Sequence, residues 1–544
     1  MSASLGSGSG GVVTSATDHG DTGPPDRFLQ RMEVAVIDED RLPVVIASGQ
    51  SIERHLLVTP VDLMARACEA AFDQVPKLRH RVDRLSVVDI MTRRGPAPAT
   101  ELAGQLRIAP PVTEITTIGG NSPQWLVNRA AADIAAGRLE VTVIAGAEAI
   151  RSSRQRRRDG LPPDSGDSAL LPDPVVGDDQ PGIGPAESAI GLLAPVHIYP
   201  LFESVLAARA GRTAEQQRQA IGDLFAPFTR VAADNPFAWF PRALSASDIA
   251  TPGPDNRIVC EPYTKRMTAF LGSDQGAAVV VCSLGAARRA GVADQAVFVW
   301  AGASAVDVRF PTARPDPGRS PAIAIAGRAL FRAAAQASGS GGRPSGIDDI
   351  DVIDLYSCFP CAVAMAADAL GLAHDDPRGL TTTGGRPYFG GPGNNYTTHG
   401  IAAVTDRLRN SDGAAPRLGL VTGLGWFVTK HALGLYGSAP PPGGFRPGDT
   451  NEDQRIIDAS GVNVAEEVAD PTTATVVAAT VVRDHDGSAT GAPLIARLPD
   501  GRHVAAGPVD DEVTAAMGEL DIPGVVGTDV VIEGGPPRYR LPHR

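Results

Sequence analysis

The sequence contains few cysteines and no apolar run that is both long enough and free enough of charge to cross a membrane. Its five cysteines are scattered over 544 residues, which is too few for the disulfide framework of a small secreted domain. The N-terminus lacks the charged and then apolar pattern of a signal peptide. We therefore expect a cytoplasmic protein of several domains, because a chain of this length can bury an ample core.

The chain also has fewer basic than acidic residues. The formal net charge is -13, and the basic residues are arginines except for Lys77, Lys265 and Lys430. Neutralising the phosphates of a nucleic acid needs a basic face, so no nucleic-acid partner is expected. Cys358 and Cys361 form a Cys-x-x-Cys pattern, but no second pair completes a zinc site and no thioredoxin-like setting surrounds it. We expect neither a bound metal nor a covalently bound cofactor.

Composition divides the first half of the chain. Residues 1–27 are rich in Gly, Ser, Thr and Asp, which predicts a disordered tail. Residues 162–185 form a linker rich in Pro, Gly and Asp. A helical pattern follows over residues 188–254, with Tyr199 and Thr213 at helix starts.

Residues 116–124 form the segment with the most functional character. They read Thr-Thr-Ile-Gly-Gly-Asn-Ser-Pro-Gln and lie between a β-branched run and an apolar helical run that we expect to end at Gly137. The first N–H groups of a helix have no partners within it, and the peptide dipoles add there, so such a turn attracts anions. Residues 140–148 then predict a buried parallel strand.

This unit resembles the nucleophile region of thiolases. In that family a reactive Cys is followed by any residue, Ser and Gly, then by a helix ending Ile-x-x-Gly and a strand ending Ala-Gly-Gly-x-Glu. On this spacing Gly120 stands where the reactive Cys belongs, and Ser122 falls on the Ser of the motif. Gly146 and Glu148 match the end of the strand.

The second half of the chain resembles further thiolase motifs, in the same order. Residues 381–392 are similar to the Asn-x-x-Gly-Gly-x-x-x-x-Gly-His-Pro signature, with Gly391 in place of the catalytic His. Residues 354–359 resemble the His-Asp-Cys-Phe motif of the sterol-carrier-protein-type thiolases, with Tyr356 in place of the His and Cys358 retained. Residues 419–426 resemble the terminal glycine-rich strand, with Thr422 where a second Cys belongs.

The resemblance implies an α/β protein with the thiolase fold. That fold has two similar βαβαβαββ halves in five layers, with a helical loop domain inserted in the first half. The implied segments are the tail (1–27), the N-terminal half (28–160), the linker and loop domain (161–262), the last strands of that half (263–295) and the C-terminal half (296–440).

Beyond this region, residues 446–544 predict a separate β domain. Short apolar runs recur there and are divided by Asp-Gly turns at Asp486 and Asp500. The spacing favours a small antiparallel barrel, and it resembles the OB-type domains that accompany thiolase-like aldolases. The segment is acidic and almost free of aromatics, so we expect a docking or substrate-covering role in place of nucleic-acid binding.

The missing residues argue against ordinary thiolase chemistry. Loss of a covalent nucleophile costs on the order of 10⁴ to 10⁶ in rate, and glycine cannot attack a carbonyl. Our first hypothesis is a protein of lipid or sterol metabolism that binds coenzyme A or an acyl-CoA thioester, with a pocket enlarged by the glycine. Arg151 and Arg154 belong to a cluster that either meets the coenzyme A phosphates or forms a solvated basic loop. The predicted binding residues are Gly120, Asn121, Ser122, Arg151, Arg154 and Gly391.

A second hypothesis retains catalysis but changes the reaction. Thiolase-like aldolases of steroid side-chain breakdown also lack the Cys and use tyrosines in similar motifs. A phenol can donate to a developing enolate or accept a proton, so the chain could be an acyl-CoA carbon–carbon lyase of the retro-aldol type. The candidate catalytic residues are Tyr356, Cys358, Tyr396 and His399.

A third hypothesis is a partner protein with a vestigial pocket, which would work with another enzyme of lipid metabolism. Thiolases are usually dimers through their core, and the added C-terminal domain leaves both a monomer and a homodimer open.

Overall fold

A large mixed sheet carries both halves of the protein. The structure, a computed structural model, describes residues 37–542 apart from 94, 340–342 and 411–414. The predicted disordered tail lies outside the described residues. Within them the strand order of the sheet is β10-β11-β12-β9-β1-β8-β4-β2-β3-β5, with β13 paired to β9.

The first half supplies one side of this sheet. In it β2 pairs in parallel with β3 and β4, while β8 pairs in antiparallel fashion with β1 and β4. The short strand β5 pairs in parallel with β3 on its outer edge. The strands are β1 (Pro43–Ile52), β2 (Arg84–Val87), β3 (Val112–Thr116), β4 (Val141–Ala149), β5 (Val175–Val176) and β8 (Asp274–Ser283).

The second half repeats part of this pattern. Here β12 pairs in antiparallel fashion with β11 and β9, and β10 runs parallel to β11. The two halves join where β1 pairs with β9. The strands are β9 (Val297–Val306), β10 (Val352–Asp354), β11 (Leu418–Gly425), β12 (Lys430–Gly437) and β13 (Arg446–Pro447).

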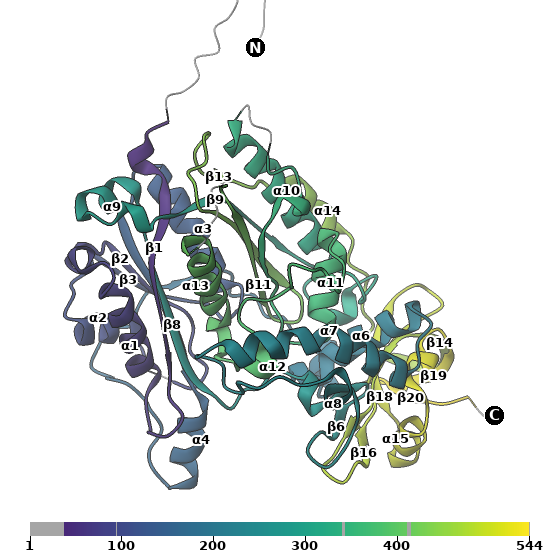
Figure 1. Cartoon of the computed structure of the whole chain (residues 1–544). Coiled ribbons are helices and arrows are strands. Elements are labelled where there is room, and N and C mark those ends of the chain that lie inside the picture. Colours follow the sequence, from purple (N-terminus) through teal and green to yellow (C-terminus); the bar gives the residue numbers. More distant parts are fainter. Residues whose placement is uncertain (1–36, 94, 340–342, 411–414, 543–544) are drawn as a thin grey trace, which may run out of the picture. The chain divides into compact units, whose positions relative to one another are not determined.

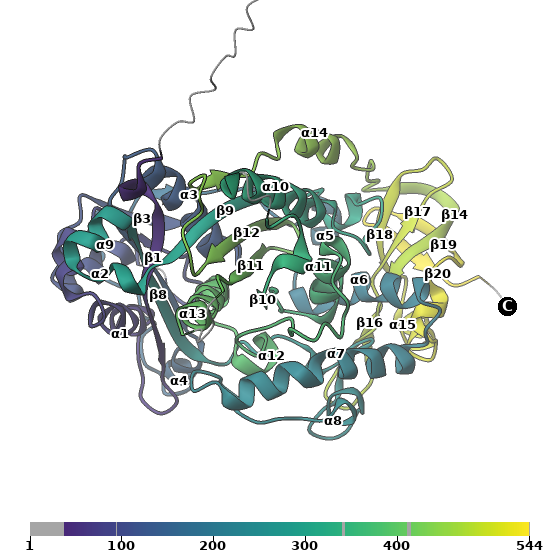
Figure 2. The same ribbon diagram turned by 45° about the horizontal axis from the view of Figure 1, so that its top comes forward.

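Helices complete the five layers expected of a thiolase fold. Two central helices, α3 (Ser122–Ala135) and α13 (Tyr396–Arg409), contact strands of both halves and each other. Figures 1 and 2 show both helices between the two groups of strands. The outer helices are α1 (Pro60–Phe72) and α2 (Pro98–Leu106) on the first half, and α10 (Pro321–Ala337) and α11 (Pro360–Leu370) on the second.

The predicted strand, turn, helix and strand unit is confirmed. β3 leads into α3, Gly137 takes a positive φ of 71° just after the helix, and β4 follows as a fully buried strand. Side chains from α3, α13 and both groups of strands form one central core. The N-terminus of α3 therefore lies inside the molecule, where strands and loops of the second half can reach it.

The predicted helical segment forms the cover of the second half. Thr213 is the N-cap of α7, as expected, and its side chain accepts from the N–H of Gln216. The expected start at Tyr199 was wrong, because the preceding helix begins at Pro195 and carries Pro200 inside it. Its helices are α6 (Pro195–Arg209), α7 (Ala214–Asp234) and α8 (Ala246–Ala250). Before it come α4 (Ile150–Arg158), which contacts β8, and α5 (Pro185–Ala189).

The C-terminal segment forms a closed five-stranded barrel, as the sequence predicted. Gly487 and Gly501, the second residues of the two Asp-Gly turns, both have a φ of 88°. The barrel is not wholly antiparallel, because β18 and β20 pair in parallel. Its strands are β14 (Val468–Ala479), β17 (Leu494–Arg497), β18 (His503–Pro508), β19 (Asp529–Gly534) and β20 (Arg538–Arg540), with α15 (Asp511–Gly518) packed beside them.

The barrel is attached to the helical cover. The N–H of Ala479 donates to Ser204 Oγ of α6 at 3.2 Å, and Arg483 pairs with Glu261 at 2.9 Å. A small sheet bridges the two parts, made of β6 (Ile258–Cys260), β7 (Tyr263–Thr264), β15 (Val482–Arg483) and β16 (Ala489–Gly491). Before the barrel, α14 (Asn451–Ala459) packs on α10 and β9 of the second half. Among the described residues, no helix is both long and apolar enough to cross a bilayer.

Candidate ligand site

The glycine turn at the start of α3 is fixed by the second half of the chain. The N–H of Gly119 donates to Asn394 Oδ1 at 3.1 Å, and the carbonyl of Gly120 accepts from Thr397 Oγ1 at 2.6 Å. Both partners follow the Gly391 signature and lie at the start of α13 or just before it. The two segments with missing catalytic residues therefore meet, as the family resemblance implies.

The space next to Gly120 is filled, which corrects the expectation of an enlarged pocket. A Cβ atom at this position would lie 2.7 Å from Tyr356 Cζ, closer still to the tyrosine hydroxyl, and 2.5 Å from the carbonyl oxygen of Leu424. Tyr356 follows β10, is 4% exposed, and its N–H donates to Thr422 Oγ1 at 2.8 Å. The side chain that replaces the family's His has thus moved into the place of the family's Cys.

A buried arginine occupies the place next to Gly391. A Cβ atom there would lie 2.7 Å from the carbonyl oxygen of Phe270 and 3.2 Å from Arg386 Nη2. Arg386 opens α12 (Arg386–Phe389) and is 9% exposed. Its Nη1 donates to Tyr356 Oη at 2.6 Å, so the side chain that fills the space at Gly120 is hydrogen-bonded to one that lies beside Gly391.

Sequence reasoning missed Arg386. The signal was a charged residue inside a signature whose other positions are Gly, Thr, Pro and aromatic residues. Burial raises the pKa of its partner Tyr356 to about 12, although the Arg386 charge acts in the opposite direction. The phenol therefore remains protonated at neutral pH and can donate its own proton while it accepts from Arg386.

The other predicted catalytic residues are divided between two environments. Tyr396 lies beside Tyr356, with ring centroids 5.4 Å apart, and its hydroxyl bonds Thr383 Oγ1 at 2.6 Å and Ser357 Oγ at 3.0 Å. His399 lies a turn further along α13, where its Nδ1 bonds Gln50 Oε1 of β1 at 2.7 Å. Burial lowers the pKa of His399 to about 3, so the ring is neutral.

No described cysteine provides a thiolate at this site. Cys358 is 3% exposed, and burial raises the pKa of its thiol. Cys361 is fully buried, and burial raises the pKa of that thiol as well. All five cysteines are free and buried, so the Cys-x-x-Cys pattern forms no disulfide. Within the described part of the chain, no cluster of His, Cys, Asp or Glu could hold a metal ion.

A surface pocket lies next to the Gly391 segment. We call it the arginine pocket; it has a volume of about 620 Å³ and is lined by Arg151, Arg154, Arg157, Arg158, Phe270 and Gly272. Arg151 pairs with Asp274 at 2.9 Å and donates to the carbonyl of Leu56. Arg154 and Arg157 are exposed, and neither forms an ion pair with a described residue. The pocket is therefore positively charged and accessible.

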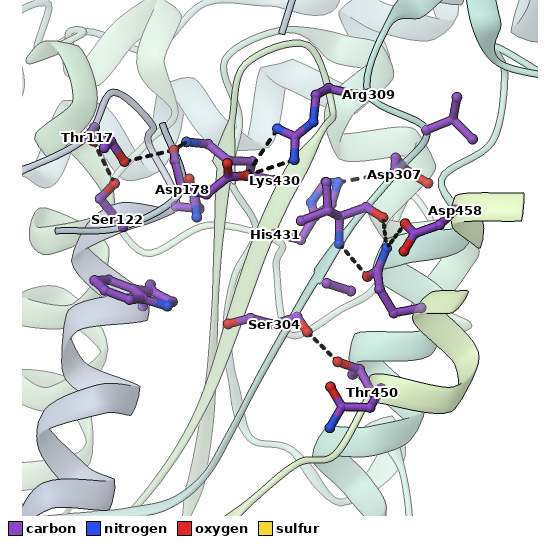
Figure 3. Close-up of a pocket in the computed structure, with 18 residues that line it drawn as sticks. Thr117, Ser122, Asp178, Ser304, Asp307, Arg309, Lys430, His431, Thr450 and Asp458 are labelled. Carbon is purple, nitrogen blue, oxygen red and sulfur yellow. Dashed lines mark hydrogen bonds and ion pairs between the residues drawn. The ribbon is translucent and has the colours of Figure 1, made fainter. Parts of the chain in front are cut away.

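A second pocket lies beside the glycine turn, where Lys430 Cε would lie 3.1 Å from a Cβ atom at Gly119, and we call it the lysine pocket. Its volume is about 520 Å³, and Figure 3 shows its lining residues. Asn121 and Ser122, both predicted ligand residues, line this pocket and not the space around Tyr356. The Lys430 amine donates to the carbonyls of Ile118 at 2.7 Å and Asp178 at 2.9 Å. Burial lowers the pKa of Lys430.

The charges of the lysine pocket are largely satisfied within it. Arg309 pairs with Asp178 at 3.0 Å, and the His431 ring lies 3.5 Å from Asp307. Ser320 also donates to Asp307. Figure 3 shows the Arg309–Asp178 and His431–Asp307 pairs in the wall of the pocket. Of the predicted binding residues, Arg151 and Arg154 line the arginine pocket, Asn121 and Ser122 line the lysine pocket, and Gly120 and Gly391 line neither.

Comparisons with known proteins identify the class. No family model and no curated protein matches the sequence. Among solved structures, a monomeric SCP2-thiolase like protein type 1 from Mycobacterium smegmatis is 29% identical, with a TM-score of 0.77; the match covers 92% of this chain and 99% of that one.

Two further solved structures share the fold at lower identity. The Ltp2-ChsH2(DUF35) aldolase is 20% identical with a TM-score of 0.56, over 73% of this chain and 98% of that one. Acetyl-CoA acetyltransferase from Syntrophomonas wolfei is 16% identical with a TM-score of 0.53, over 73% of this chain and 99% of that one. The chain therefore has the thiolase fold with a fused C-terminal barrel and is similar to thiolase-like proteins.

Proposed function

We propose that the protein binds coenzyme A or an acyl-CoA thioester of lipid or sterol metabolism and does not carry out thiolysis or condensation. The observation that carries this proposal is the position of Tyr356. Its hydroxyl occupies the space of a nucleophile at Gly120, so neither a thiol nor a bound acyl group can take that place without rearrangement. The substitution is therefore built into the packing of the site.

The arginine pocket supports coenzyme A as the ligand. Guanidinium groups form paired hydrogen bonds with phosphate oxygens, and coenzyme A carries phosphates at the end opposite to its sulfur. The pocket wall includes Phe270 and Gly272, and Leu271 between them has its Cδ2 atom 3.1 Å from the Cβ position of Gly391. A ligand with its phosphates on the arginines would thus have its other end close to the Gly391 segment.

Calorimetric titration with coenzyme A tests binding. We expect saturable heat with the full-length protein and a weaker affinity in the variant Arg154→Gln/Arg157→Gln, because each lost phosphate contact removes a charge-assisted hydrogen bond. Arg328→Gln/Arg332→Gln removes two exposed arginines from α10, away from the pocket, and is the matched control. Absence of heat and of any thermal shift at millimolar coenzyme A would remove the proposal.

A turnover assay tests the second part of the proposal. With acetoacetyl-CoA and coenzyme A we expect no acetyl-CoA, because no described cysteine stands at the start of α3. Formation of acetyl-CoA by the purified protein, at a rate proportional to its concentration, would contradict it.

A carbon–carbon lyase is the second candidate, and the Tyr356–Arg386 hydrogen bond favours it. In a retro-aldol step a base removes the proton of a β-hydroxyl group, and the bond between the α and β carbons breaks. Its electron pair moves into the thioester as an enolate, which then takes a proton at the α carbon. A phenol held by a guanidinium is suited to stabilise the enolate oxygen. Tyr396 is less suited, because two hydroxyl groups already engage its oxygen.

Product analysis separates the two candidates. The protein is incubated with a β-hydroxyacyl-CoA, and a ketone and a shortened acyl-CoA are sought. The lyase function requires both products in equal amounts and their loss in Tyr356→Phe, whereas binding alone gives neither product.

The edge of the sheet supports a monomer. In the described chain, β5 pairs with Ile115 and Thr116 on the outer edge of β3, so this part of the edge is not free to pair with a second copy. Light scattering should give the mass of one chain, 56.3 kDa. A stable mass of twice that value at micromolar concentration would favour a homodimer instead.

A further inference from the structure

Arg386 is a buried cation without a counter-ion. It is 9% exposed, and the only hydrogen bond of its guanidinium with a described residue runs from Nη1 to Tyr356. Its Nε is buried and has no partner. No described carboxylate lies within ion-pair distance of it. Burial of a charge is unfavourable unless the charge is paired, so this arrangement is incomplete as it stands.

The surroundings of Arg386 offer only partial compensation. Its guanidinium carbon lies over the rings of Tyr356, at 5.6 Å, and Tyr396, at 5.9 Å. The acidic groups that act on its charge are Tyr356, Cys358, Tyr199 and Tyr396. Burial raises the pKa of each of these groups, so all four are neutral at physiological pH. Aromatic faces attract the cation but do not neutralise it.

The free edge of the guanidinium has the shape of a carboxylate receptor. Nε and Nη2 lie on the same side of the group and form a fork that matches two carboxylate oxygens. Gly391 faces this edge, because a Cβ atom there would lie 3.2 Å from Nη2. Glycine at this position therefore places no side chain against Nη2, whereas a larger residue there would contact it.

Leu271 lies between this edge and the arginine pocket. Leu271 is 37% exposed, and its Cδ2 atom lies 3.1 Å from the Cβ position of Gly391. Its neighbours Phe270 and Gly272 line the arginine pocket. Leu271 is thus the side chain that a ligand extending from the pocket to Arg386 has to displace.

We propose that the Nε–Nη2 edge of Arg386 binds a carboxylate carried by the acyl group, so that the preferred ligands are coenzyme A mono-thioesters of short dicarboxylic acids. This inference rests on the proposed binding of acyl-CoA thioesters. A thioester carbonyl alone is a weaker partner, because it is neutral and leaves the guanidinium charge unbalanced.

The test compares succinyl-CoA with butyryl-CoA by calorimetry on the full-length protein. The two acyl groups have the same number of carbons, but succinyl ends in a carboxylate and butyryl ends in a methyl group. We expect succinyl-CoA to bind about tenfold or more tightly, which is the gain of a charge-assisted, bidentate hydrogen bond. If the wild-type protein binds both thioesters equally, or butyryl-CoA more tightly, the inference is wrong.

Variants assign the preference to Arg386. In Arg386→Gln the ratio of the succinyl-CoA affinity to the butyryl-CoA affinity should fall to about one. Tyr356→Phe, which retains the guanidinium, should keep the preference. Arg386→Lys retains the charge without the fork and should keep only part of it. A preference that survives unchanged in a folded Arg386→Gln protein would contradict the assignment.

Free succinate and free butyrate separate this inference from the proposed function. If succinate binds in an Arg386-dependent way while coenzyme A and both thioesters do not, the carboxylate site stands and the coenzyme A function fails. If coenzyme A binds but neither succinate nor succinyl-CoA shows any preference, the function stands and the carboxylate site is wrong.

Discussion

The two sides of the glycine turn at α3 differ in what the second half of the chain places against them. On the side of Tyr356 and Arg386, buried side chains fill the space that a thiolase uses for its nucleophile and its His. On the other side, the lysine pocket is open, and its charges are paired with each other or with backbone carbonyls. The same helix N-terminus thus has one closed face and one open face.

This difference shows how a catalytic site can be lost without leaving a hole. An empty space in a packed interior destabilises the fold, so the loss of two side chains has to be compensated by others. Tyr356 and Arg386 provide that compensation, and they also bring a charge that the closed side does not neutralise. The open side needed no such change, because its lining residues bond one another.

Restoring the nucleophile should have the largest effect. Gly120→Cys places a Cβ atom against Tyr356 and 2.5 Å from the Leu424 carbonyl. We expect a loss of about 3 kcal/mol in the free energy of unfolding, measured by denaturant titration, since overpacking moves both side chain and backbone. Tyr356→Ala in the same chain should recover part of this loss. If the Gly120→Cys protein is as stable as the wild type, the space beside Gly120 is not filled by Tyr356.

A buried carboxyl group at the end of β4 should also make stability depend on pH. Burial raises the pKa of Glu148 from 4.5 to about 7, against the effect of hydrogen bonds from Thr92 and Met91. Because the folded-state pKa lies above the unfolded value, the contribution is complete below about pH 4.5 and is lost as the pH rises through 7. It amounts to at most about 3 kcal/mol. In Glu148→Gln the free energy of unfolding should change less between pH 4.5 and pH 7. An unchanged slope would mean that another group causes this pH dependence.

Removal of the tyrosine hydroxyl should have a smaller effect. Tyr356→Phe leaves Arg386 without its one hydrogen-bond acceptor, and we expect a loss of about 2 kcal/mol in unfolding free energy. Equal stability of the variant and the wild type would mean that water or a ligand replaces the hydroxyl.

The matching change on the open side should have the smallest effect. Arg309→Gln removes a partly exposed ion pair with Asp178, which is worth less than about 1 kcal/mol. The comparison of the two sides fails if Arg309→Gln costs as much as Tyr356→Phe in the same denaturant titration.

The local unit around the turn was predictable from the sequence, because it depends on short-range patterns. The β-branched run before residue 119 indicated β3. The apolar helical run that ends at Gly137 indicated α3, and the apolar run over residues 140–148 indicated β4. The barrel strands were predictable from the Asp-Gly turns. The thiolase motifs also indicated that the segments of Gly120 and Gly391 meet.

The contents of the site could not be predicted from such patterns. Tyr356 reaches Gly120 from the second half of the chain, and its position is fixed by the hydrogen bond of its hydroxyl with Arg386 and of its backbone N–H with Thr422. Asn121 and Ser122 line the lysine pocket, whereas Gly120 faces Tyr356. The sequence does not specify in which direction each of these residues points at the helix start. The parallel pairing of β18 with β20 likewise depends on long-range closure of the barrel.

A crystal structure of the protein with coenzyme A is the most direct test of the central claim. The account predicts phosphates on Arg154 and Arg157 and the pantetheine sulfur beside Gly391, with Leu271 displaced. Coenzyme A bound in the lysine pocket, with its sulfur at Asn121 and Ser122, would contradict it.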